Sequence, residues 1–277
     1  MFQNMTPAAP LRKRGTTAVQ SGTQSVLRAI RLLKMFSDVQ PEWNLSDLAR
    51  AAELNKTTTY RLLTALEREG MLARNRRTGA YRLGPETIAL GGRALRCNDL
   101  RVAGHPELES LARTIGEAAT LEVLVGDQVL IMDEVAASYL VAPWQSIGAR
   151  YPAHATSTGK LLLAFLPEAE RQVALRRPLQ RLTDKTITDP DELERQMAHI
   201  RRQGYATASE ELEPDFVAVS APVRNHDGQV VAAVSIGGTA TRMSSSRLPQ
   251  VIESVTQAGC HISERLGFRE SSVTADL

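Results

Sequence analysis

The chain has 277 residues, of which 43% are hydrophobic and 23% are charged, and its formal net charge is +2. This composition is typical of a globular protein, and the length favours two domains of ordinary size. No apolar run approaches the roughly 20 residues that a membrane helix needs, and residues 1–22 lack the features of a secretion signal. We therefore expect a cytoplasmic protein with a disordered N-terminal tail. The two cysteines, Cys97 and Cys260, are too few and too isolated for a disulfide framework or a CxxC metal site.

The charge is divided unevenly along the chain. Residues 1–98 contain 16 Lys and Arg against 7 Asp and Glu, a net charge of +9, and the remainder contains 17 against 24, a net charge of −7. A basic module therefore precedes an acidic body. Because neutralising phosphates dominates the affinity for nucleic acids, this excess of cations is compatible with a polyanion-binding module.

Three helices are predicted in the basic module. Apolar residues recur at helical spacing from Ser25 and predict a first helix that stops before Pro41. Ser46 offers a hydroxyl cap to a short second helix, and Asn55 is the predicted cap of a third. Gly70 suits the left-handed C-terminus of that third helix. Two short helices joined by a tight turn predict a helix-turn-helix unit.

The second helix of such a unit lies in the major groove of DNA with its first side chains near base edges. Hydroxyls, cations and an aromatic group at this end of the predicted third helix suit contacts with phosphates and bases. The alternative is a solvated polar face on a small helical bundle. The candidate DNA-binding residues on the helix are Lys56, Thr57, Thr58, Tyr60, Arg61 and Thr64.

Two short strands, 71–74 and 80–83, are predicted on either side of a loop with adjacent arginines and a turn glycine. Clustered positive charge at a hairpin tip favours an anion as its partner, and the DNA backbone is such an anion. The hairpin is therefore the predicted wing, and Arg74, Arg76, Arg77 and Arg82 are its candidate phosphate contacts. Residues 84–95 predict a linker helix opened by Pro85.

The acidic body has an α/β pattern. Strands are predicted at 120–125 and 128–134, joined by a Gly126-Asp127 turn, and at 217–224 and 229–236. Helices are predicted at about 106–116, 157–165, 189–203 and 246–266. A mixed sheet with flanking helices accounts for this pattern.

The sequence resembles the IclR family of transcriptional regulators. The matching segments are 23–29 (TQSVLRA), 45–49 (LSDLA), 56–63 (KTTTYRLL), 152–164 (PAHATSTGKLLLA), 204–206 (GYA), 211–214 (ELEP) and 220–223 (SAPV). Their order and spacing extend the resemblance from about residue 23 to Phe268.

The resemblance implies an α/β (α+β) fold with an N-terminal winged helix-turn-helix, a linker helix and a C-terminal GAF-like mixed α/β effector-binding domain. We predict these parts at 23–83, 84–98 and 99–268, between tails at 1–22 and 269–277. The resemblance further implies a repressor or activator of a catabolic operon. Such a protein binds a palindromic double-stranded DNA operator as a homodimer or homotetramer, without catalysis, and responds to a small organic acid. We expect neither a cofactor nor a metal.

The predicted effector site lies where the 157–165 helix begins, because free backbone N–H groups and the helix dipole favour a carboxylate there. Simple helix capping is the alternative role for its hydroxyls. The family resemblance adds positions on facing strands, several of them small here, which favours a larger or aromatic acid. Trp144 and Tyr151 are candidates for a pocket wall or for the core. The candidate effector-binding residues are His154, Thr156, Ser157, Thr158, Ala208, Ala218, Ser235 and Gly237.

Two other functions remain open. Ser157 and Lys160 fit the S-x-x-K spacing of serine acyl-enzymes, although neither accompanying motif of that class is present, so a serine acyl-transfer enzyme is one alternative. A constitutive DNA-binding scaffold whose C-terminal domain only assembles copies is the other. A phosphate-binding loop is excluded because its first glycine would fall at His154. The five histidines show no metal-site spacing.

Overall fold

The computed structural model describes residues 21–137, 147–175 and 178–269. Most of the tails predicted at 1–22 and 269–277, namely residues 1–20 and 270–277, lies outside the described residues, as does the candidate wall residue Trp144. Contacts divide the chain into two compact units between Ala94 and Leu95. The domain boundaries drawn from the sequence remain predictions. Within the described ranges, none of the helices combines the length and the apolar character needed to cross a bilayer.

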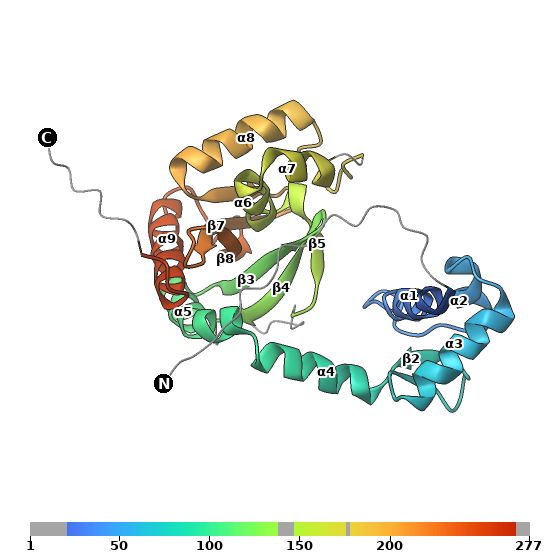
Figure 1. Cartoon of the computed structure of the whole chain (residues 1–277). Coiled ribbons are helices and arrows are strands. Elements are labelled where there is room, and N and C mark those ends of the chain that lie inside the picture. The colour runs from blue at the N-terminus through green and yellow to red at the C-terminus, as the bar shows by residue number, and fades with distance from the viewer. Residues whose placement is uncertain (1–20, 138–146, 176–177, 270–277) are drawn as a thin grey trace, which may run out of the picture. The chain divides into compact units, whose positions relative to one another are not determined.

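The first unit contains three helices followed by a two-stranded hairpin. Its elements are α1 (Ser21–Leu33), α2 (Leu45–Ala51), α3 (Lys56–Arg68), β1 (Leu72–Arg74), β2 (Tyr81–Leu83) and α4 (Pro85–Arg96), the last of which ends two residues beyond the division between the units (Figure 1). The helices and the hairpin share one small core around Leu32, Leu48, Leu63 and Leu72. This architecture is the predicted winged helix-turn-helix.

The helix caps of this unit are partly as predicted. Asn55 caps α3, since its Oδ1 accepts a hydrogen bond of 2.7 Å from the backbone N–H of Thr58. Gly70 has a φ of 69°, as the left-handed end of α3 requires. Ser46 is not a cap, and that prediction is wrong. Helix α2 begins at Leu45, two residues earlier than a cap at Ser46 implies; Leu45 packs against the core, and the cap position is Asn44.

A short segment before α2 pairs with the wing like a third strand, and this contact was not predicted. Trp43 and Tyr81 exchange two backbone hydrogen bonds, of 2.9 and 2.8 Å, as an isolated antiparallel bridge. The indole N–H of Trp43 also donates to the carbonyl of Met35 at 3.1 Å. A bridge of one residue leaves no periodic pattern in the sequence, although it ties the wing to the segment before α2.

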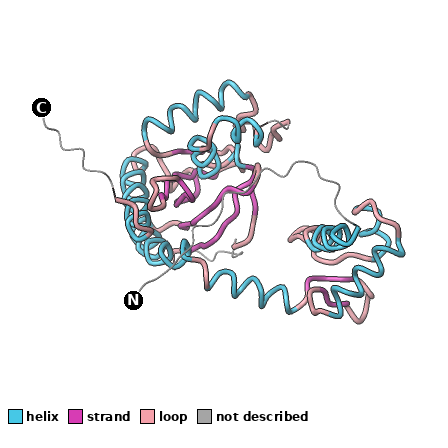
Figure 2. The backbone as a smooth tube through the Cα atoms, viewed as in Figure 1, coloured by secondary structure: helices cyan, strands magenta, loops and turns pink. Residues whose placement is uncertain are grey.

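The second unit is a six-stranded sheet with helices on both faces. Its elements are α5 (Asp99–Ile115), β3 (Ala118–Val125), β4 (Gln128–Val135), β5 (Arg150–Pro152), the 3₁₀ helix η1 (Ala153–Ala155), α6 (Ser157–Phe165), α7 (Glu168–Ala174), α8 (Pro190–Gln203), β6 (Ala206–Ser209), β7 (Phe216–Arg224), β8 (Val230–Thr239) and α9 (Leu248–Arg265). The strand order is β5-β4-β3-β8-β7-β6. Figure 2 shows the strands of this sheet in magenta beside the cyan helices of the unit. All pairings between these strands are antiparallel, so the expectation of a mixed sheet is wrong, while the mixed α/β domain is confirmed.

Alternating side chains give the sheet two different faces. Val219 and Val234 point into a core that α5 and α9 cover, together with Leu108 and Val255. The opposite face is covered by α6 and α8, whose Leu161 and Met197 belong to a second core (Figure 1). The residues between those of the first core, such as Ala218 and Ser235, therefore face the α6 side.

Helix α5 begins earlier than predicted. It starts at Asp99, where the Asn98 side chain accepts a hydrogen bond of 3.0 Å from the N–H of Arg101, and it continues through Pro106. Pro106 lacks a backbone N–H and therefore removes one hydrogen bond from the helix interior. For this reason the helix was predicted to begin at about Pro106. The short elements β5, β6, η1 and α7 were not predicted either.

Candidate functional site

The polar face of α3 is largely open to solvent. Thr59 and Leu63 are buried on the opposite face, and Thr59 donates its hydroxyl proton to the Asn55 carbonyl at 3.0 Å. The predicted contact residues Lys56, Thr57, Tyr60, Arg61 and Thr64 are exposed, and Thr58 is half-buried. The helix therefore presents these side chains together, as a recognition helix requires.

The wing arginines differ in their surroundings. Arg76 and Arg77 are exposed at the tip, where Asn75 Oδ1 accepts from the N–H of Arg77 at 3.0 Å and orders the loop. Arg82 is also exposed, on β2. Arg74 instead lies over the Tyr81 ring, 4.7 Å from its centroid, and donates to the Tyr81 hydroxyl. Its role as a phosphate contact remains a prediction, and its observed contacts stabilise the hairpin.

A cavity of about 520 Å³ lies on the α6 side of the sheet in the second unit. Four small residues stand side by side on neighbouring strands and form its floor: Ala208, Ala218, Gly237 and Ala118. A larger residue at any of them would occupy the cavity. Phe216 forms a wall against Gly237, where an added Cβ would overlap the phenyl ring. The small strand residues of the sequence prediction are thus brought together.

The start of α6 closes one side of the cavity. Thr156 caps the helix by accepting a hydrogen bond of 3.0 Å from the N–H of Gly159, and Thr156, Ser157 and Thr158 all line the cavity. The first N–H groups of a helix have no partner within it, and the helix dipole adds partial positive charge there. This end of the cavity suits an acceptor group. Ser235 and Tyr151 line the cavity as well.

His154 is not part of this cavity. Its side chain is buried, and its Nε2 lies 2.9 Å from the carbonyl oxygen of Gln180. It borders a separate, smaller cavity beside η1. Its position shortly before α6 explains why sequence proximity alone grouped it with Thr156 and its neighbours.

The cavity also contains carboxylates that were not predicted from the sequence. Glu122 accepts hydrogen bonds from the hydroxyls of Thr158 at 2.6 Å and Thr120 at 2.7 Å, and its side chain is buried. Burial raises the pKa of Glu122, the two hydroxyl bonds oppose that rise, and the charge of Glu134 adds to it. Strand alternation was the available signal, since it places Glu122 on the same face as Thr120 and Ala118.

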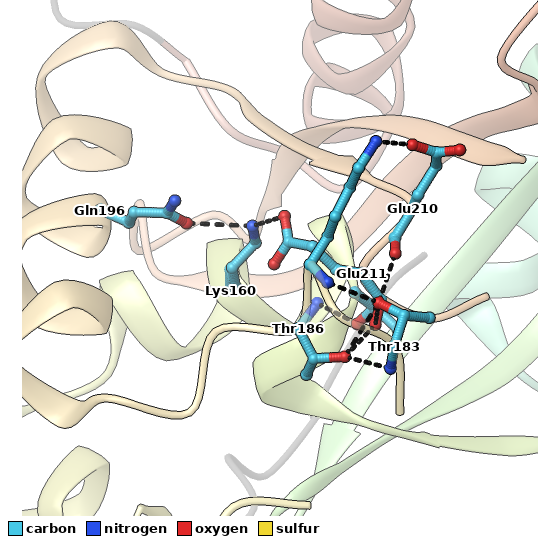
Figure 3. A network of polar contacts seen from close by, with 9 residues as sticks. Lys160, Thr183, Thr186, Gln196, Glu210 and Glu211 are labelled. Atoms are coloured by element: carbon cyan, nitrogen blue, oxygen red, sulfur yellow. Dashed lines mark hydrogen bonds and ion pairs between the residues drawn. The ribbon is translucent and has the colours of Figure 1, made fainter. Parts of the chain in front are cut away.

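A buried ion pair fixes the wall beside α6 (Figure 3). Lys160 Nζ lies 2.6 Å from Glu211 Oε1 and 3.0 Å from Gln196 Oε1 of α8. Burial lowers the pKa of Lys160, and the Glu211 carboxylate acts in the opposite direction. The Glu211 carbonyl accepts from the Thr186 hydroxyl at 2.6 Å. The network thus joins α6, α8 and two loops that carry the cavity residues Leu182 and Leu212.

Family comparisons agree with both units. The model described as the IclR helix-turn-helix domain matches residues 25–76. The model described as the bacterial transcriptional regulator IclR C-terminal domain matches residues 92–264, which is more than half of the chain.

Individual relatives extend over nearly the whole chain. The chain is 32% identical to the HTH-type transcriptional regulator XynR of Escherichia coli, over 88% of this chain and 98% of that protein. It is 31% identical to the regulator KipR of Bacillus subtilis, over 90% and 100%. An IclR homologue from Microbacterium hydrocarbonoxydans, solved in complex with 4-hydroxybenzoate, is 29% identical, with a TM-score of 0.74 over 87% of this chain and 98% of that one.

Proposed function

Because the chain belongs to the IclR family of ligand-responsive transcriptional regulators, we propose that it binds a palindromic operator through α3 and the wing. In this proposal, a small organic acid that fills the cavity raises or lowers the affinity for the operator. The observation that carries this proposal is the cavity, in which a helix N-terminus and a floor of small residues face one another. A catabolic operon in the cytoplasm is the proposed target. The protein acts in this proposal by binding alone, without catalysis.

The effector part of the proposal is tested by thermal shift of the full chain against aliphatic and aromatic carboxylates, since a ligand that binds the folded state raises the melting temperature. The proposal expects stabilisation by a subset of them and a change in operator affinity with the same subset. The 4-hydroxybenzoate complex of the Microbacterium homologue supports including benzoates. Stabilisation by none of them would remove the acid from the proposal.

Arg61 is the proposed base-reading residue of α3. Replacing it by alanine is expected to weaken operator binding by about 1–3 kcal/mol while leaving the affinity for random DNA nearly unchanged, because a base contact contributes to specific binding alone. Fluorescence anisotropy on both duplexes measures the difference. An equal loss on operator and random DNA would make Arg61 a phosphate contact.

The wing is proposed to bind the DNA backbone. In the double variant Arg76→Ala/Arg77→Ala, affinity should fall on every duplex, and the slope of log affinity against log salt should become shallower by about 0.9 for each phosphate that the wing no longer neutralises. A salt titration of wild type and variant gives this slope. An unchanged slope would remove the wing from the interface.

Assembly into a homodimer or homotetramer is also part of the proposal. Several large apolar side chains of the first unit are exposed, among them Val26 (58%) and Leu27 (51%) on α1 and Ile88 (78%) on α4. Exposed apolar groups at this density favour contact with another chain. A dimer would also match the twofold symmetry of a palindromic operator. Analytical ultracentrifugation of the full chain tests this assembly.

The two alternative functions fit the structure less well. A serine acyl-enzyme needs the lysine near the serine hydroxyl, whereas the Lys160 ammonium is bound to Glu211 and Gln196. A constitutive scaffold has no use for a cavity floored by small residues. A hydrolase assay on the full chain and the thermal-shift screen distinguish these functions from ligand-responsive regulation.

A further inference from the structure

The charged residues that line the cavity are all acidic. Its described lining includes the carboxyl groups of Glu122, Glu134, Glu211 and Glu213, and it includes no Lys, Arg or His. Lys160 pairs with Glu211 from behind the wall, and Glu213 is exposed. Glu122 differs from both, because it is buried and its hydrogen-bond partners in the structure are two neutral hydroxyls.

The position of Glu122 bears directly on how an acid is held. Thr158, which donates to Glu122 Oε2, is the second residue of α6, so the carboxyl group lies beside the helix start. An effector carboxylate at that helix start would lie next to the Glu122 carboxyl group. Two carboxylates that share one site do not both remain ionised, because the second charge is strongly disfavoured.

We propose that Glu122 meets the effector as a neutral carboxylic acid whose O–H donates to the effector carboxylate, so that one proton from solvent is taken up with each acid bound. This inference rests on the proposed function, because it requires an acid as the effector. In its neutral form, Glu122 would make the cavity selective for an anion, although acidic residues line it.

The other ionisable residues that line the cavity support a neutral form of Glu122. From β4, Glu134 adds negative charge; from β5, the Tyr151 phenol contributes no positive charge. From the segment after β6, Glu211 is already paired with Lys160 of α6, and Glu213 is acidic. None of these groups offers a cation to an ionised Glu122. Burial, which removes water from the ionised carboxylate, also raises the pKa of Glu122.

Calorimetric titration of the full chain between pH 5 and pH 8 with 4-hydroxybenzoate and butyrate, which each carry a single carboxyl group, tests the inference. Affinity for the acid that binds should be constant at low pH and then fall by about tenfold per pH unit once the free Glu122 ionises. Titration in buffers of different ionisation enthalpy should show one proton taken up in that range. Glu122→Gln, which keeps a neutral donor of the same shape, should bind at every pH with neither effect.

Glu213→Gln is the matched control, because it removes a charge from the same cavity at an exposed position and should keep the pH dependence. Acid binding without proton uptake, unchanged in Glu122→Gln, would overturn the role of Glu122 and leave the acid effector intact. Binding of 4-hydroxybenzylamine that is lost in Glu122→Gln would also overturn it, because Glu122 would then be ionised. Absence of binding by both acids to wild type and Glu122→Gln, with operator binding retained, would overturn this inference together with the acid effector.

Discussion

Lys160→Met is expected to destabilise the second unit by about 3–5 kcal/mol, because it leaves the Glu211 carboxylate buried without its cation. Among the described residues, Glu211 Oε2 already has no hydrogen-bond partner, so the carboxylate depends on the Lys160 ammonium. Hydrogen exchange of the full chain, followed on peptides from α6 and from α3, measures the loss in each unit separately. The α6 peptides should lose protection, and the α3 peptides should not.

Two further variants show whether burial is the cause. The double variant Lys160→Met/Glu211→Leu should recover most of the lost stability, since replacing both members of a buried pair by apolar groups is often neutral. Lys185→Met removes the neighbouring ion pair with Glu210, whose lysine is 60% exposed, and should change stability by about 1 kcal/mol at most. Equal losses from Lys160→Met and Lys185→Met would contradict the argument.

Local sequence signals predicted the elements that carry clear caps and long periodic patterns. The helix at 157–165 was predicted with the bounds that the structure has, because an apolar run follows hydroxyl residues that suit a cap. Strand β5 has three residues, which is too short for an alternation to be recognised. The helix start predicted at about Pro106 was wrong, because the packing of α5 on the sheet outweighs the cost of one missing backbone donor.

The candidate site likewise contains residues that could be predicted from the sequence and a contact that could not. The small floor residues Ala208, Ala218 and Gly237 were reached through family resemblance, and the strand register explains why they lie together. The pairing of Lys160 with Glu211 joins residues 51 positions apart, and no local pattern encodes such a contact. Lys160 is the one charged residue of α6, next to an apolar run, and this was the available signal that the helix needed a buried anion nearby.

Gly159→Ala is expected to be among the most disruptive single-methyl substitutions in the second unit. An added Cβ at this position would overlap the backbone carbonyl and Cα of Ala153, because α6 begins in close contact with η1. Neither backbone can move without displacing the Thr156 cap or the cavity wall. Overpacking of this kind costs about 1–3 kcal/mol and more where backbone must shift. The free energy of unfolding, measured with urea on the full chain, and the affinity for the effector should both fall.

Gly91→Ala is the matched control, because Gly91 lies within α4, is exposed and has no heavy atom within 4 Å of an added Cβ. Removing a glycine from a helix interior favours the helix by about 1 kcal/mol, so this variant should be neutral or slightly stabilising. The two substitutions add the same methyl group, and their opposite signs isolate the contact with Ala153 as the cause. Unchanged stability and effector affinity in Gly159→Ala would contradict this argument. They would mean that the start of α6 can move away from Ala153 without destabilising the unit or changing the cavity.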